Sequence, residues 1–185
     1  MPKQRDGNLV RRPPPTGVSD GGMKQVQALA LSDGDIRKLL GDVPIMTNRQ
    51  LPSVSSIDQM FDAQGRCIML YTPNDPTSGH WVCLIRKPTH IFYFDSYGDK
   101  PDIPDDLGDQ PPLLTQLLKA SGMPVFYNTK QYQVERANVA TCGRHVISRL
   151  IYAEKTPEQY DAIIKKSGLS ADDFVSGLIY GFLGK

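Results

Sequence analysis

The sequence predicts a single α+β domain with a small central sheet, mixed or antiparallel, and helices on both sides. Three observations predict it. Short apolar runs bounded by turn residues, typical of strands, gather in the middle of the chain, and stretches with apolar residues at helical spacing follow them. The length of 185 residues with 39% hydrophobic content is enough for one ordinary core. We therefore expect one domain, over residues 23–185.

The strand predictions come from apolar runs and the turn residues around them. Residues 66–71 lie between Gly65 and a Pro/Asn/Asp-rich turn. The runs 81–86 and 91–94 are joined by four residues, a linker short enough for an antiparallel hairpin. Further strand-like runs lie at 125–127 and 131–134.

Helices are predicted from capping residues and apolar spacing. Ser32 begins a short capped helix that Gly41 ends, and leucines at helical spacing start at Leu113. From Cys142 onward the apolar positions fit one face of a helix buried under the sheet. Two more helices open at Thr156 and Ser170, which are N-cap residues. The sequence therefore places helices before and after the strand cluster.

Residues 1–22 are basic and rich in Pro and Gly, a composition that predicts a disordered arm. Either the arm tethers nucleic acid or a partner, or it is plain solvated disorder, and composition favours the second. The net charge of +1, from 21 basic and 20 acidic side chains, gives no overall field that would draw the protein to nucleic acid or an anionic membrane.

Cysteine usage and the N-terminus indicate a reducing, intracellular setting. Three cysteines cannot all pair, and no long apolar core of a signal peptide is present. No apolar run approaches the ~20 residues that a membrane span requires.

Three residues supply the parts of nucleophilic acyl transfer: a base, its orienting acid and a thiol. His80 precedes the strand 81–86, and Asp95 follows the strand 91–94, so antiparallel pairing would bring them together. Cys142 lies at the first turn of a predicted helix, where the helix dipole lowers a thiol pKa. Each residue also has a non-catalytic alternative: His80 as a surface histidine, Asp95 as a turn residue and Cys142 as a buried apolar residue. Cys67 and Cys83 fit the buried alternative.

An oxyanion would also need hydrogen-bond donors. Gln131, Gln133 and the backbone N–H of Cys142 are candidates, and spacing alone cannot choose between the two glutamines. His145, three residues beyond Cys142, has a spacing that suits a metal pair, but no second His/Cys pair completes a zinc site. We therefore expect no metal and no cofactor.

The segments Gly79-His80-Trp81, Asp95 with the Ser-Tyr-Gly after it, and Thr141-Cys142-Gly143 together resemble the adenain family of viral maturation proteases. The wider clan includes the ubiquitin-like-protein proteases, and similar proteins occur in virophages. The resemblance covers residues 32–152. It implies a papain-like or adenain-like cysteine protease fold, with the nucleophile at the start of a buried helix.

Residue roles follow from this resemblance. It implies that His80 is the base, Asp95 its orienting acid, Cys142 the nucleophile and a preceding Gln the oxyanion donor. We favour Gln133 over Gln131, because it is nearer to Cys142 and follows an aromatic residue.

The resemblance also implies a substrate class and a setting. Protein substrates would be capsid or core precursors cut after Gly, and the setting would be the virion and the host cytoplasm. Relatives use DNA or a small peptide as activator, which makes either a possible partner here, and no membrane is expected. The Gly21-Gly22 pair suggests the hypothesis of self-cleavage after Gly22.

Other functions share these residues. The same set could serve a deubiquitinase or SUMO-type protease acting on host conjugates, or an acetyltransferase that takes its acetyl group from coenzyme A. A non-catalytic interaction protein is the least favoured alternative, because the set of candidate catalytic residues is complete.

Overall fold

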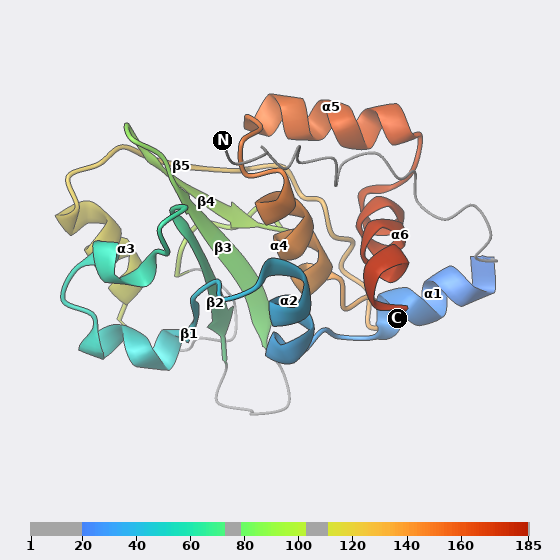
Figure 1. The fold of residues 1–185 in the computed structure, drawn as a ribbon, viewed down its shortest axis with the longest axis horizontal. Coiled ribbons are helices and arrows are strands. Elements are labelled where there is room, and N and C mark those ends of the chain that lie inside the picture. The colour runs from blue at the N-terminus through green and yellow to red at the C-terminus, as the bar shows by residue number, and fades with distance from the viewer. Residues whose placement is uncertain (1–19, 73–78, 103–110, 185) are drawn as a thin grey trace, which may run out of the picture.

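The computed structural model describes residues 20–72, 79–102 and 111–184. A five-stranded mixed sheet, in the order β1-β2-β3-β4-β5, forms its centre (Figure 1). The three middle strands, β2 (Arg66–Tyr71), β3 (His80–Arg86) and β4 (Ile91–Asp95), are antiparallel. The edge strands β1 (Ile45–Thr47) and β5 (Val125–Tyr127) each run parallel to their neighbour. The predicted α+β class with a small mixed sheet is confirmed.

The middle strands are near-continuous apolar runs because both faces of the sheet are covered. Every residue of β4 is buried, and so are the five central residues of β3. Along β3, Trp81 and Cys83 point into one hydrophobic cluster, and Val82 and Leu84 point into the other. This alternation is the two-residue period of a strand, used here to fill two cores.

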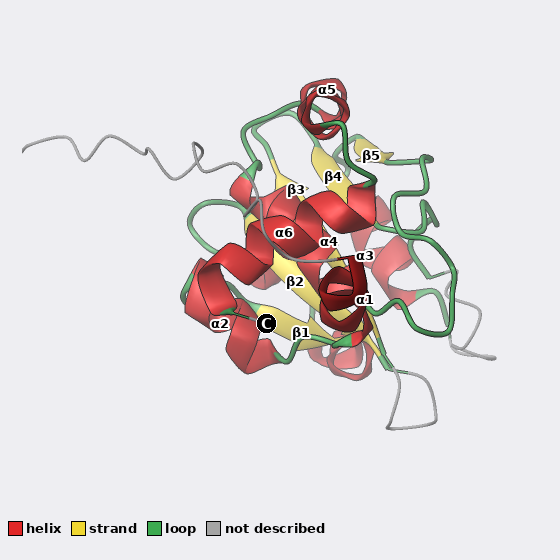
Figure 2. Cartoon of the chain, turned by 90° about the vertical axis from the view of Figure 1, so that its right-hand side faces the viewer, coloured by secondary structure: helices red, strands yellow, loops and turns green. Residues whose placement is uncertain are grey.

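Helices cover both faces, as predicted. On one face α4 (Cys142–Ile151) lies against β3, with α2 (Asp33–Leu40) and α6 (Ala171–Leu183) packed on it. Figure 2 views the molecule from this side, with α6 in front of the strands. The remaining elements are α1 (Asp20–Ala28) against α6, α5 (Pro157–Ser167), and α3 (Leu113–Ala120) with the 3-10 helices η1 (Asn48–Ser53) and η2 (Ile57–Met60) on the other face.

One predicted strand is wrong. Residues 131–134 form no strand, because their backbone binds a turn and not a sheet edge. The N–H groups of Tyr132 and Gln133 both donate to the carbonyl of Ser96, at 2.8 and 2.9 Å. The apolar Tyr132 side chain is buried in the core beside α4, which explains its strand-like pattern.

The predicted arm lies outside the described residues as far as residue 19, and its last three residues belong to α1. Gly22 therefore lies inside a helix, so α1 would have to unwind before the bond after Gly22 could enter an active site. Among the residues described, no helix has the length and apolar character to cross a membrane.

Candidate active site

His80 and Asp95 meet at the end of the β3–β4 hairpin. The register pairs Val82 with Asp95, so His80, two residues earlier on β3, is a diagonal neighbour of Asp95 on the same face. His80 Nε2 lies 2.9 Å from Asp95 Oδ1. The predicted proximity of imidazole and carboxylate is confirmed.

The Asp95 carboxylate is fully buried and held by the backbone as well as by His80. Its Oδ1 also accepts the N–H of Tyr97 at 2.7 Å. The Asn128 side chain accepts the Asp95 N–H at 3.0 Å and donates to the Asp95 carbonyl at 2.5 Å. Asn128 follows β5 directly, so its amide group continues the pairing of β4 after the backbone ladder ends. These contacts fix where the carboxylate points.

Cys142 begins α4 and is 9% exposed. Burial alone would raise the pKa of its thiol, but a hydrogen bond and charge from His80, with the backbone N–H groups of Trp81 and Gly143, lower it below its ordinary value. Cys142 therefore lies at the N-terminus of a buried helix, as predicted, and within hydrogen-bonding reach of His80.

The imidazole shows the opposite shift. Burial lowers the pKa of His80, but hydrogen bonds to Asp95 and Cys142 and their negative charges raise it to about 10. A lowered thiol pKa beside a raised imidazole pKa describes a thiolate–imidazolium pair. Because Asp95 engages Nε2, Nδ1 is the ring nitrogen left for the sulfur.

Aromatic residues and one glycine close the space around this pair. The ring of Tyr97 stacks on His80, with centroids 4.9 Å apart. Trp81 donates its indole N–H to the carbonyl of Leu31 at 3.2 Å. A Cβ on Gly143 would lie 3.3 Å from both Leu31 Cβ and Trp81 Cδ1, so a residue without a side chain lets the first turn of α4 approach β3.

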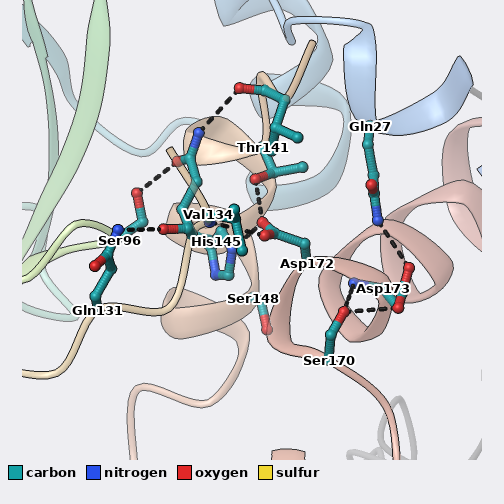
Figure 3. Close-up of polar contacts among 12 residues, drawn as sticks. Gln27, Ser96, Gln131, Val134, Thr141, His145, Ser148, Ser170, Asp172 and Asp173 are labelled. Atoms are coloured by element: carbon teal, nitrogen blue, oxygen red, sulfur yellow. Dashed lines mark hydrogen bonds and ion pairs between the residues drawn. The ribbon is translucent and has the colours of Figure 1, made fainter. Parts of the chain in front are cut away.

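The two glutamines differ in environment (Figure 3). Gln133 is 2% exposed, its Oε1 accepts the Ser96 hydroxyl at 2.8 Å, and its Nε2 donates to the Val139 carbonyl at 3.3 Å. Gln131 is exposed, and its amide folds back onto the carbonyl of Gln133 at 3.0 Å. Each amide keeps a second N–H, but only the Gln133 side chain is buried and held at both its oxygen and its nitrogen.

His145 has a partner that the sequence did not indicate. Its Nε2 lies 3.0 Å from Asp172 Oδ1, at the start of α6. The sequence did not indicate Asn128 or Asp172, because each contacts a residue of the site about thirty positions away in the chain. No local pattern predicts such a contact. Among the residues described, no group of three or more His, Cys, Asp or Glu side chains could hold a metal ion.

Comparison with known proteins shows the family. "Uncharacterized protein V9" of the Sputnik virophage is 31% identical over 140 residues, which cover 70% of this chain and 79% of that protein. The chain belongs to the same family as this virophage protein. No protein-family model matches the chain.

Solved structures with similar folds include three described here. The central domain of Lpg1148 from Legionella pneumophila is 17% identical, with a TM-score of 0.42, over 84% of this chain and 99% of that one. The yeast Ulp1 protease domain in complex with Smt3 is 17% identical, with a TM-score of 0.41, over 88% and 82%. The ASFV protease is 12% identical, with a TM-score of 0.41, over 84% and 67%. At such low identity these likenesses concern the fold alone.

We expect iodoacetamide to alkylate Cys142 selectively in the native protein. Its reactivity should rise with pH through the lowered thiol pKa, below the ordinary value of 9.0, because the thiolate is the reacting form. Burial raises the pKa of Cys67 to about 12 and raises that of Cys83 further, so both should stay unmodified.

Mass spectrometry of peptides measures the extent of alkylation at each cysteine after a fixed time. The reactions are run from pH 5 to 10 by roughly one-unit steps. The His80→Ala variant is the control, and its Cys142 should need a higher pH than the parent to react, because the hydrogen bond and charge that lower the thiol pKa are lost. Equal alkylation of all three cysteines would contradict the thiolate–imidazolium pair.

Proposed function

We propose that this protein is a cysteine endopeptidase with Cys142 as nucleophile, His80 as general acid and base, and Asp95 as the residue that orients His80. The observation that carries the proposal is the meeting of three groups: a thiol of lowered pKa, an imidazole of raised pKa, and a buried carboxylate 2.9 Å from that imidazole. A charged pair of this kind in a shielded site is what acyl transfer to a thiol requires.

The reaction has two halves. The Cys142 thiolate attacks the peptide carbonyl carbon, and the tetrahedral intermediate collapses as the imidazolium of His80 gives its proton to the leaving amine. This leaves a thioester and a neutral imidazole. His80 then takes a proton from water, the resulting hydroxide attacks the thioester, and the carboxylate product leaves as the thiolate–imidazolium pair forms again.

Two donors support the oxyanion in this proposal. One is the backbone N–H of Cys142 at the start of α4, and the other is the side-chain amide of Gln133, which Ser96 holds in one orientation. Such donors act on the charge that develops in the transition state, in a site from which water is largely excluded.

We also propose that the substrates are viral precursor proteins cut after Gly. The near-complete burial of the Cys142 thiol, with Trp81 and Tyr97 beside the site, favours residues without side chains at the scissile bond. Membership of a virophage protein family supports a viral precursor, such as a capsid protein, as the substrate.

The alternative is a deubiquitinase or SUMO-type protease. The same narrow access would accept a Gly-Gly tail, and the chemistry at Cys142 would not change. The difference lies in what surrounds the scissile bond: a capsid precursor offers a short Gly-containing segment, whereas a ubiquitin-like substrate offers a folded body next to its tail.

Replacing Cys142 by Ala should abolish cleavage of Gly-containing peptides, by about 10³-fold or more in kcat, because the covalent route is lost. The His80→Ala variant should fall by a similar factor, since the two residues act as a unit. A fluorogenic peptide library read by mass spectrometry measures both. Cys67→Ala and His90→Ala are the matched controls, because both residues lie away from the site, and both variants should keep activity. Full cleavage by the Cys142→Ala variant would contradict the proposal.

Replacing Gln133 by Ala should lower kcat by about 10²-fold, the typical cost of losing one oxyanion donor, with KM little changed. Gln131→Ala should stay within about twofold of the parent, because its side chain is exposed and binds only the backbone. Steady-state kinetics on one peptide compares them. A larger loss in Gln131→Ala would reverse the assignment of the donor.

A substrate panel should separate the viral and the host-conjugate alternatives. We expect Gly-containing capsid-type peptides to be cleaved with higher kcat/KM than ubiquitin or SUMO fused to a reporter. Acetyl-coenzyme A consumption is measured in the same series and should be absent without and with acceptor protein. Faster cleavage of a ubiquitin-like fusion than of every peptide would favour the deconjugating function.

A further inference from the structure

Asp172 is a buried carboxylate in the first turn of α6, and three donors from other segments point at it (Figure 3). Its Oδ1 accepts the Thr141 hydroxyl at 2.5 Å and faces His145 Nε2 at 3.0 Å. Its Oδ2 accepts the backbone N–H of Val134 at 2.9 Å. Both carboxylate oxygens are therefore used within the protein.

The three partners share one property: each is next to a group of the proposed site. Thr141 directly precedes Cys142 and is the N-cap residue of α4. Val134 directly follows Gln133. His145 lies one turn along α4 from Cys142. A single carboxylate thus joins the backbone that carries the nucleophile to the backbone that carries the proposed oxyanion donor.

The hydrogen-bond partners of Asp172 favour the ionised form of its carboxylate. Burial would raise the pKa of Asp172, but hydrogen bonds from His145, Thr141 and the Val134 N–H lower it. Burial lowers the pKa of His145, so its ring is neutral and gives its Nε2–H to the carboxylate. His145 Nδ1, an acceptor in this tautomer, has no hydrogen-bond partner among the residues described. Hydrogen bonds to an ionised acceptor are the stronger kind.

Asp172 is not needed to cap its own helix. Ser170 is the N-cap residue of α6, and its hydroxyl accepts the Asp173 N–H at 3.1 Å and donates to the Asp173 carboxylate at 2.6 Å. Asp173 also accepts the side-chain amide of Gln27 from α1 at 2.8 Å. The two adjacent carboxylates on α6 therefore bind different segments. Asp173 binds the N-terminal end of its own helix and α1, and Asp172 binds the segment around Cys142.

We infer that Asp172 is a positioning residue, which sets the distance and orientation between the Gln133 amide and the Cys142 sulfur and backbone N–H through its bonds to Val134 and Thr141. This inference rests on the proposed function. Besides Asp172, the described polar contacts of residues 134–141 include Gln133 Nε2 to the Val139 carbonyl at 3.3 Å and the Ala140 N–H to the Gln27 carbonyl at 2.8 Å. Neither joins the Gln133 side directly to Thr141, as Asp172 does. A small displacement of an oxyanion donor is enough to slow catalysis.

The test compares Asp172→Asn with Asp173→Asn, which removes the same charge from the next residue of the same helix. For Asp172→Asn we expect kcat to fall about 10- to 100-fold with KM within about threefold, because geometry and not substrate binding is lost. Asp173→Asn should keep kcat. Steady-state kinetics on the best peptide of the library gives the split.

A second measurement does not depend on turnover. Hydrogen–deuterium exchange should speed up in Asp172→Asn over residues 131–143 and stay unchanged over residues 80–95. Thr141→Val, which removes only the hydroxyl donor, should show a smaller loss of kcat, and the double variant should be no worse than Asp172→Asn alone. Thr141→Val also serves if Asp172→Asn fails to fold.

The outcomes are distinguishable. Unchanged exchange over residues 131–143 overturns the inference whether or not the parent cleaves peptides. Faster exchange with an unchanged kcat makes Asp172 structural only, which also overturns it. A parent protein that shows no peptidase activity overturns the proposed function and with it the catalytic meaning of Asp172, while the exchange result alone decides whether the carboxylate holds this segment.

Discussion

The hydrogen bond between His80 and Asp95 is the contact on which the candidate site depends. A buried carboxylate without donors costs several kcal/mol, so Asp95 needs the imidazole and the Tyr97 N–H that it binds. In return it engages Nε2 of His80 and leaves Nδ1 for the sulfur of Cys142. Removing Asp95 would take away the partner of His80 Nε2, and removing His80 would leave the buried carboxylate with the Tyr97 N–H. The antiparallel hairpin is therefore both the centre of the sheet and the frame of the site.

The Cys142 thiol is positioned by the helices on one face of the sheet and not by the hairpin. Cys142 lies on α4, which packs across β3, and Gly143 allows the close approach that brings the sulfur to the imidazole. The position of α4 is set in turn by α2 and α6 on its outer side. The two halves of the site thus sit on rigid elements, which suits groups whose relative geometry decides the rate.

Some of the polar contacts around the site come from segments without regular structure. Residues 131–134 bind the turn at Ser96 and not a strand, and this places Gln133 inside the molecule. A strand pattern was expected there, because Tyr132 and Val134 alternate with glutamines. The alternation reflects burial of one aromatic ring in the core beside α4, and periodicity cannot tell that from a sheet edge.

By itself the sequence predicted most of the elements and indicated the candidate site residues. The apolar runs of β2 to β4, the caps at Ser32, Thr156 and Ser170, and the order of His80, Asp95 and Cys142 all come from local patterns. Only the tertiary structure decided that Asn128 holds Asp95, that Gln133 and not Gln131 is buried, and that Asp172 joins the segments around Cys142. These are contacts between residues distant in the chain, and a local pattern carries no information on which distant group satisfies a buried polar atom.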